Sequence, residues 1–173
     1  MILIRIATVV DFELLASLGS QSFFEAFARY NNPEDIQSYL ETAFAPSTIR
    51  KQLEDPDVVY FIATDDGKAV GYSKLKRNSA PKELPQSNCI QLERIYALQS
   101  YLGKNVGKEL MEKCLETAKV EGFEILWLGV WQKNERAINF YNKWGFKVIG
   151  YKQFIIGKEV SDDFVMALNI KNE

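Results

Sequence analysis

The chain has no histidine among its 173 residues, so acid–base chemistry must come from aspartate, glutamate, tyrosine, lysine or cysteine. This absence excludes Ser-His-Asp and Cys-His nucleophile pairs and metal sites built on histidine ligands. The two cysteines, Cys89 and Cys114, show no ligand spacing. We therefore expect buried free thiols rather than a disulfide or a zinc site, and we expect no metal.

Two glycines and two lysines lie where a strand-like segment turns into a helix: Gly103, Lys104, Gly107 and Lys108. Glycine lets backbone N–H groups approach a ligand closely, and a helix N-terminus adds unpaired N–H donors and the positive end of a dipole. The spacing matches neither a Walker loop nor a complete GxGxxG motif. Two interpretations stay open: a phosphate site, or an ordinary helix start with two solvated lysines.

A second helix carries an amide and a phenol on one side. Asn134, Ala137, Ile138 and Tyr141 follow the spacing i, i+3, i+4, i+7, so they share one face of that helix. The helix follows an apolar, strand-like segment at Ile125–Trp131. This arrangement predicts that Asn134 and Tyr141 face the same neighbour.

The elements that position these residues follow from hydrophobic spacing and turn signals. Helices are expected from Asp11, as N-cap, to about Arg29, from Pro33 through Phe44, briefly after Pro46, over Val106–Val120 and over Asn134–Trp144. Strands are expected at Leu3–Ala7, Val58–Thr64, Ala69–Lys76, Cys89–Leu98, Ile125–Trp131, Lys147–Ile156 and Asp163–Asn169. The order β-α-α-α-β-β-β-α-β-α-β-β predicts an α/β fold with a mixed sheet. No repeat or linker divides the chain, so residues 1–173 are interpreted as a single domain.

Composition narrows the class of protein. The hydrophobic fraction of 47% and charged fraction of 25% are those of an ordinary globular protein. A net charge of −2 gives no field that would attract nucleic acid, and the longest apolar runs are too short to span a membrane. The N-terminal residues lack the features of a signal peptide, so a cytoplasmic location is expected.

Three segments carry a resemblance to a known family. Leu102–Gly107 resembles motif A of the GNAT superfamily of N-acetyltransferases, usually Gln/Arg-x-x-Gly-x-Gly/Ala. Gly107 matches its last position, whereas Leu102 replaces the basic or amide residue and Asn105 replaces the first glycine. Asparagine is a common substitute where φ is positive. Asn134–Phe146 resembles motif B, Asn-x-x-Ala-x-x-Phe-Tyr-x-x-x-Gly-Phe, with every one of these positions kept. The stretch from Ser22 to Phe44 is similar to PaiA-type polyamine acetyltransferases in particular.

The resemblance implies the GNAT acyl-CoA N-acyltransferase fold, a mixed and mostly antiparallel sheet with helices on both faces. It implies acetyl-CoA as cosubstrate and direct attack of an amine on the thioester, without a covalent enzyme intermediate. The pantetheine arm would pair with main-chain groups between two splayed strands, and the pyrophosphate would lie on the motif A amides. Carried over to this sequence, the cofactor-binding residues are Ile95, Tyr96, Ala97, Gly103, Lys104, Asn105, Val106, Gly107, Lys108, Asn134, Ala137 and Tyr141.

The resemblance also suggests two catalytic residues. Tyr141 corresponds to the motif B tyrosine and would protonate the departing thiolate, while an N–H near Ile95 polarises the acetyl carbonyl. Glu93 corresponds to a glutamate that many relatives carry and would take the amine proton, directly or through water. The alternatives stay open: Tyr141 could only pack beside Phe140, and Glu93 could be an exposed strand residue paired with a lysine.

For the acceptor, the resemblance implies a small-molecule amine, with spermidine or spermine as first candidates. Between Asp11 and Asp57 nine acidic residues stand against three basic ones, whereas from Leu102 to Lys152 nine basic residues stand against six glutamates. An acidic half beside a basic half suits a polyamine and a polyanionic cofactor, with Glu25, Glu34 and Glu41 as candidate ligands of ammonium groups, although acidic helices are usually solvated faces. Two other readings are an enzyme for protein N-termini or lysines, and a non-catalytic acyl-CoA-binding regulatory domain. A homodimer is possible.

Overall fold

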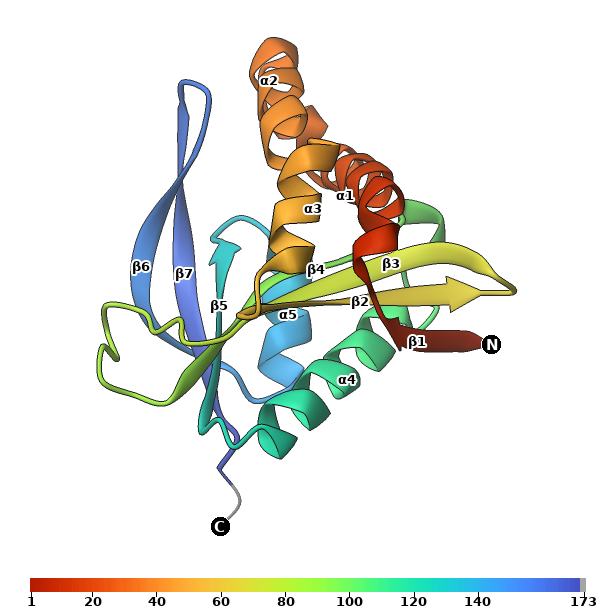
Figure 1. The fold of residues 1–173 in the computed structure, drawn as a ribbon. Coiled ribbons are helices and arrows are strands. Elements are labelled where there is room, and N and C mark those ends of the chain that lie inside the picture. Colours follow the sequence, from red (N-terminus) through yellow and green to blue (C-terminus); the bar gives the residue numbers. More distant parts are fainter. Residues whose placement is uncertain (172–173) are drawn as a thin grey trace.

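The computed structural model describes residues 1–171, which form five α-helices and one seven-stranded sheet (Figure 1). The helices are α1 (Phe12–Phe27), α2 (Pro33–Ala43), α3 (Pro46–Glu54), α4 (Val106–Val120) and α5 (Glu135–Lys143). The strands are β1 (Ile2–Ile6), β2 (Val58–Asp65), β3 (Lys68–Lys76), β4 (Cys89–Ala97), β5 (Ile125–Trp131), β6 (Lys147–Ile156) and β7 (Glu159–Asn169). None of the helices within residues 1–171 is long and apolar enough to cross a membrane.

The sheet parts in its middle. Its strand order is β1-β2-β3-β4-β5-β7-β6, and all neighbours are antiparallel except β4 and β5. These two parallel strands pair at only three positions, from Cys89 opposite Ile125 to Gln91 opposite Trp127. Beyond this point β4 continues to Ala97 and β5 continues to Trp131. The two strands no longer pair with each other there, and they diverge (Figure 1).

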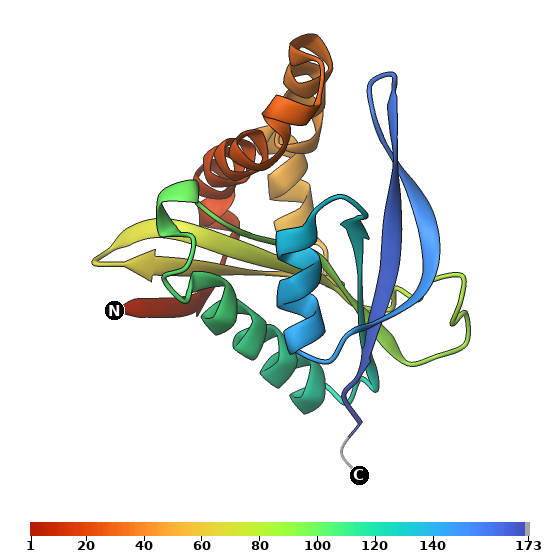
Figure 2. The ribbon, with the colours of Figure 1, turned by 180° about the vertical axis from the view of Figure 1, so that it is seen from behind.

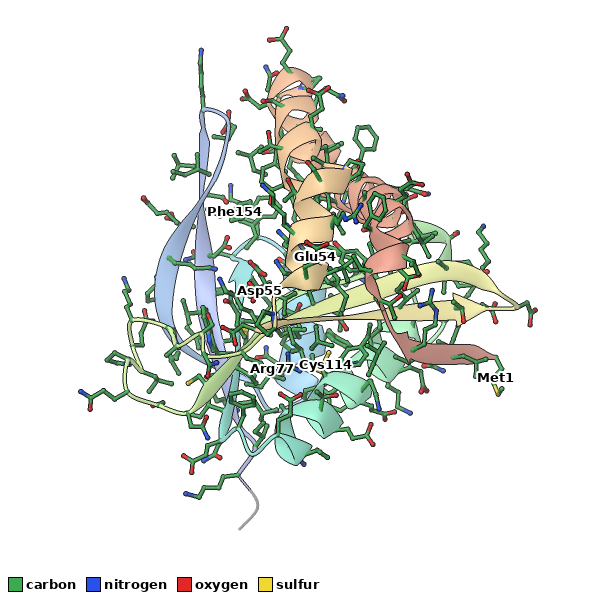
Figure 3. The ribbon with its side chains drawn as sticks, viewed as in Figure 1. Met1, Glu54, Asp55, Arg77, Cys114 and Phe154 are labelled. Carbon is green, nitrogen blue, oxygen red and sulfur yellow. The ribbon has the colours of Figure 1, made fainter. Side chains whose placement is uncertain are left out.

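Helices cover both faces of the sheet and bury a separate apolar cluster on each. On one face α4 and α5 lie together (Figure 2), with Leu110, Met111 and Cys114 of α4 fully buried against the strands. Cys114 points from α4 toward the sheet, where its thiol donates to Ser73 Oγ at 3.2 Å (Figure 3). On the other face α1, α2 and α3 bury a second cluster that includes Leu15. The parting of β4 and β5 therefore lies between two layers of helices.

A β-bulge interrupts β4 close to this parting. Lys74 of β3 pairs with Arg94, but the next β3 residue, Leu75, pairs with Leu92, so Glu93 is the extra residue. A bulge bends the strand and lets two consecutive residues share a face of the sheet. The bulge follows the last residue of β4 that pairs with β5.

The predicted fold class and element order are confirmed, with two differences in detail. Strand β7 begins at Glu159, four residues before the predicted start, because Glu159–Asp162 continues the pairing with β6. Asp11 does occupy the N-cap position of α1, but its side chain caps no amide of that helix. Its carboxylate instead binds Arg5 at 2.7 and 2.8 Å and the Thr8 N–H at 2.8 Å, closing the short 3₁₀ turn before the helix.

Candidate functional site

The unpaired half of β4 presents main-chain groups toward the gap. The Leu98 N–H donates to Val70 O of β3 at 2.9 Å, and in an antiparallel ladder successive residues direct their polar groups to opposite sides. Tyr96 therefore directs its main-chain groups to β3, and Ile95 and Ala97 direct theirs away from β3 toward β5. Of the three residues expected to pair with a ligand here, Ile95 and Ala97 keep free main-chain groups and Tyr96 does not.

The start of α4 offers a second set of free donors. The first α-helical bond is donated by Glu109 to Asn105 O, so the N–H groups of Val106, Gly107 and Lys108 precede the helical ladder. Asn105 has a φ of 66° and makes no side-chain cap. The positive φ expected at this position is confirmed, and these amides stay available to an anion.

Gly103 and two lysines complete this turn. Gly103 has a φ of 77°, and a Cβ added there would meet no atom within 4 Å, so the backbone is open on that side. Lys104 Nζ lies 4.7 Å from the centre of the Tyr101 ring, and Lys108 Nζ lies 3.6 Å from Glu112 Oε1. Both lysines thus reach their contacts from exposed positions beside the helix N-terminus.

Helix α5 begins at the same side of the gap. The Asn134 side-chain oxygen accepts the Ala137 N–H at 3.2 Å, which makes Asn134 the N-cap of α5 and leaves its amide N–H₂ group for other partners. A Cβ added at Gly107 of α4 would lie 3.6 Å from the ring of Phe140. Motif B therefore packs directly against the turn that carries motif A.

Tyr141 lies in the buried cluster beneath α5, and its ring makes edge contacts with Phe140 and Phe146. Burial raises the pKa of Tyr141, so the phenol stays protonated at neutral pH. Burial raises the pKa of Tyr96 far above its usual range, and the neighbouring phenols of Tyr72 and Tyr141 add to this. Tyr141 thus belongs to the apolar cluster on one face of the sheet, and Tyr96 packs against the cluster on the other face.

Glu93, the bulge residue, forms an ion pair with Lys74 at 2.5 Å. Burial alone would raise the pKa of Glu93, but the charge and hydrogen bond of Lys74 outweigh it and the pKa is lowered. Lys74 is 3% exposed, and burial lowers the pKa of its ammonium against the opposing effect of Glu93. Glu93 is therefore paired with a lysine and ionised at neutral pH. Its carboxylate can still accept a proton while the ion pair is in place.

Arg94 lies beside this pair, on the face covered by α1, α2 and α3. Its guanidinium is 4.5 Å from the centre of the Phe44 ring and 3.5 Å from the Tyr60 hydroxyl. Neither Lys74 nor Arg94 was among the residues expected at the site. A lysine within the strand, away from its two ends, was the available signal for Lys74, whereas only the register of the bulge brings Arg94 beside it.

The acidic residues expected to bind ammonium groups lie on α1 and α2. Glu25 accepts the Gln99 N–H at 2.7 Å, and Glu41 accepts from Gln37 at 2.7 Å on the exposed face of α2. Glu34 lies exposed in the first turn of the same helix. Glu25 and Glu41 are thus already hydrogen-bonded within the chain, and Glu34 and Glu41 lie exposed on the same helix.

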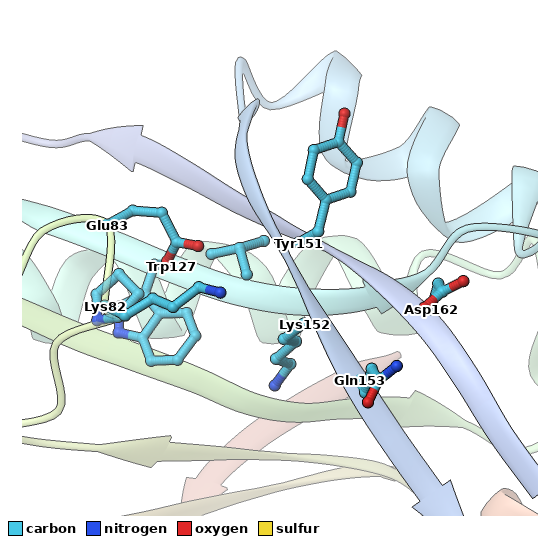
Figure 4. Close-up of a pocket in the computed structure, with 9 residues that line it drawn as sticks. Lys82, Glu83, Trp127, Tyr151, Lys152, Gln153 and Asp162 are labelled. Carbon is cyan, nitrogen blue, oxygen red and sulfur yellow. The ribbon is translucent and has the colours of Figure 1, made fainter.

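A pocket of about 450 Å³ opens between the loop at 81–83 and strands β5, β6 and β7 (Figure 4). Side chains alternate along a strand, and Leu126 and Leu128 face α4 and α5. Trp127 therefore lines the pocket on the other face of the sheet, the one covered by α1, α2 and α3. Lys152 Nζ lies 5.7 Å from the centre of the Trp127 ring. Because Trp127 is the last β5 residue that pairs with β4, the pocket begins where the strands part.

Comparison with known proteins finds similarity along most of the chain. The model of the Acetyltransferase (GNAT) family matches residues 20–146. An uncharacterised N-acetyltransferase of Lactobacillus delbrueckii subsp. lactis is 30% identical over 156 residues, which are 90% of each chain. One of Mycobacterium bovis is 34% identical over 158 residues, 91% of this chain and 97% of that one. The crystal structure of PaiA N-acetyltransferase from Thermoplasma acidophilum in complex with coenzyme A covers 98% of this chain and 99% of its own, with a TM-score of 0.79 and 24% identity.

Proposed function

Because the chain belongs to the GNAT family and is an acetyl-CoA-dependent N-acetyltransferase, we propose that it acetylates the primary amine of a small molecule where β4 and β5 part. One observation carries this placement: the free main-chain groups of Ile95 and Ala97 lie on the same strand edge that leads to the unpaired amides of α4. Two sets of donors in this order suit a ligand with an amide-bearing arm and an anionic end.

The residues present fit acetyl-CoA. The first-turn amides of Val106, Gly107 and Lys108 would hold the pyrophosphate, and Ile95 and Ala97 would bond the pantetheine amides. When bound, acetyl-CoA supplies an acetyl group activated as a thioester. Within residues 1–171 no cluster of three or more cysteine, aspartate or glutamate side chains is arranged to hold a metal ion.

Three groups of this chain would act on the reacting atoms. Glu93, ionised beside Lys74, accepts the proton of the acceptor ammonium, directly or through water. The Ile95 N–H donates to the oxygen that gains negative charge. Tyr141, protonated and buried on the α5 side, donates to the departing sulfur.

A small-molecule acceptor agrees with the pocket beside Trp127, whose volume of about 450 Å³ is that of ordinary small-molecule sites. The acceptor enters from this face because the α4 amides that would hold the cofactor lie on the opposite one. A screen at fixed acetyl-CoA that reads thiol release across polyamines, amino acids, monoamines and peptides tests the proposal. Thiol release with small amines supports the proposal. Thiol release only with peptides would show instead that the acceptor is a protein.

A polyamine acceptor is the specific candidate that follows from the PaiA-type resemblance of residues 22–44. The exposed carboxylates of α2, Glu34 and Glu41, are the groups that would attract a polycation. If they do, turnover of spermidine falls with added salt more steeply than turnover of a monoamine. Spermidine turnover no better than that of a monoamine would remove this candidate and leave the acetyltransferase in place.

Gly107→Asp is expected to weaken CoA binding by about tenfold or more, since a carboxylate beside the pyrophosphate repels it. A Cβ at this position meets only Phe140 at ordinary contact distance, so the fold tolerates the change. Asparagine has the same shape without the charge, which makes Gly107→Asn the matched control. Calorimetry with CoA measures both, and equal affinities for the two variants would contradict the anion site at α4.

A further inference from the structure

The bulge in β4 places opposite charges side by side at the parting of the sheet. Lys74 pairs with Arg94 across the strands, so both side chains leave the same face, and Tyr60 lies near both of them. Glu93, the inserted residue, reaches this face as well, because its carboxylate is 2.5 Å from Lys74. One carboxylate and two cations therefore meet on the face from which the acceptor enters.

Arg94 has no carboxylate within 4 Å among residues 1–171, whereas Glu93 is held by Lys74. Its hydrogen-bonding neighbours are phenols: the Tyr60 hydroxyl lies at 3.5 Å, the edge of hydrogen-bonding range, and Arg94 lowers the pKa of Tyr39 against the larger, opposite effect of burial. The Tyr60 hydroxyl already donates to Gln52 at 2.5 Å, and burial raises its pKa to about 12, so the phenol is neutral. The half-buried guanidinium of Arg94 therefore has no ion pair of its own, because the nearby Glu93 carboxylate binds Lys74.

The charges of this group sum to a single positive charge, from Lys74, Glu93 and Arg94. Such a group repels a second ammonium and attracts an anion. The guanidinium has a planar fork of N–H donors that matches a carboxylate through two parallel hydrogen bonds. Glu93, the adjacent residue, is the group to which the acceptor ammonium is delivered.

We propose that the acceptor is a free α-amino acid, whose carboxylate binds Arg94 while its amino group faces Glu93. The two binding groups are consecutive in the chain, and the bulge turns both to one face; an α-amino acid likewise carries its two charged groups close together, on a single carbon atom. This inference rests on the proposed function and names its substrate class. It predicts that a polyamine, which has no anionic group, is the poorer acceptor.

The test compares each of the twenty L-amino acids with its own α-carboxamide, which has the same shape and side chain but no carboxylate charge. Putrescine, spermidine and spermine are measured alongside. Thiol release from acetyl-CoA gives kcat/KM, and mass spectrometry identifies the product. The carboxamide loses its ammonium proton more readily, so a preference for the free acid cannot arise from amine basicity.

We expect the best amino acid to exceed its carboxamide by on the order of 10–100-fold in kcat/KM, the range of a charged hydrogen-bonded pair. Arg94→Gln should bring this ratio close to one, mainly through KM, and Arg94→Lys should lower it partly, because charge is kept and the fork is lost. Arg50→Gln is the matched control: Arg50 also lies over a phenylalanine ring and pairs with Glu54 on the exposed surface of α3, and the ratio should stay unchanged.

Three results would overturn the inference: a best acceptor no better than its carboxamide, a polyamine better than every amino acid, or a ratio that both Arg94 variants leave intact. The first two use the wild-type protein and need no variant to fold. Thiol release at similar rates with amines of all kinds would contradict only the proposed binding of a carboxylate by Arg94. No release with any amine removes the proposed function, and this inference with it.

Discussion

Replacing Tyr141 by phenylalanine is expected to lower kcat by roughly 10–10³-fold, the range between partial and full loss of general-acid help. The change removes one hydroxyl and keeps the ring that packs against Phe140 and Phe146. Burial and the nearby Cys114 thiol act on this hydroxyl, with no hydrogen bond among the influences on its pKa, so its removal leaves no protein group without a partner. CoA affinity and thermal stability should therefore change little, and steady-state kinetics measure the effect.

Tyr30→Phe makes the same chemical change at an exposed position between α1 and α2 and serves as the control. Its kcat should equal that of the wild-type protein. A normal kcat for Tyr141→Phe would show that Tyr141 only packs in the core. Water would then protonate the CoA thiolate. The sequence offers no histidine to take over the proton transfer.

Glu93→Gln is expected to lower kcat/KM by about 10²-fold or more, in line with the loss of a general base. The defect should shrink at high pH, where more of the acceptor amine is already unprotonated. The ionised carboxylate is the active form of Glu93, and Lys74 keeps its pKa below the usual value. The activity that depends on Glu93 is therefore lost only when the pH falls below the range in which glutamate ordinarily titrates. Lys74→Met should raise this pKa and move the acidic limb of the pH–rate profile upward.

Removing Glu93 alone leaves the buried ammonium of Lys74 without its partner, which costs free energy of unfolding. The double variant Lys74→Met, Glu93→Gln removes both charges and should recover stability but not activity. Thermal unfolding and kcat/KM of the single and double variants separate the two effects. A loss of activity that is independent of pH, or that the double variant restores, would assign Glu93 to positioning rather than proton transfer.

The sequence was sufficient for those features that depend on local spacing. Alternation and helical periodicity predict each strand and helix, since both reflect contacts within one element. The motif B residues from Asn134 to Phe146 are contiguous, so their common placement beside Gly107 follows from one helix. The positive φ at Asn105 was likewise predictable, because few residues other than glycine adopt it.

The features that depend on pairing between distant segments were not predictable. Whether Glu93 is an extra residue depends on how β4 aligns with β3, and one register shift decides which side chains share a face. The grouping of Lys74, Glu93 and Arg94 follows from that shift alone. Likewise, Asp11 is a residue type that often caps a helix N-terminus. Its carboxylate instead accepts two hydrogen bonds from Arg5 of β1.

A crystal structure of this protein with CoA tests the placement of the reaction most directly. We expect pyrophosphate oxygens within about 3.2 Å of the N–H groups of Gly107 and Lys108, at hydrogen-bonding distance. We also expect pantetheine amides bonded to the main chain of Ile95 and Ala97, with the thiol beside Tyr141. CoA bound away from the edge of β4, or a thiol remote from both Glu93 and Tyr141, would contradict this placement.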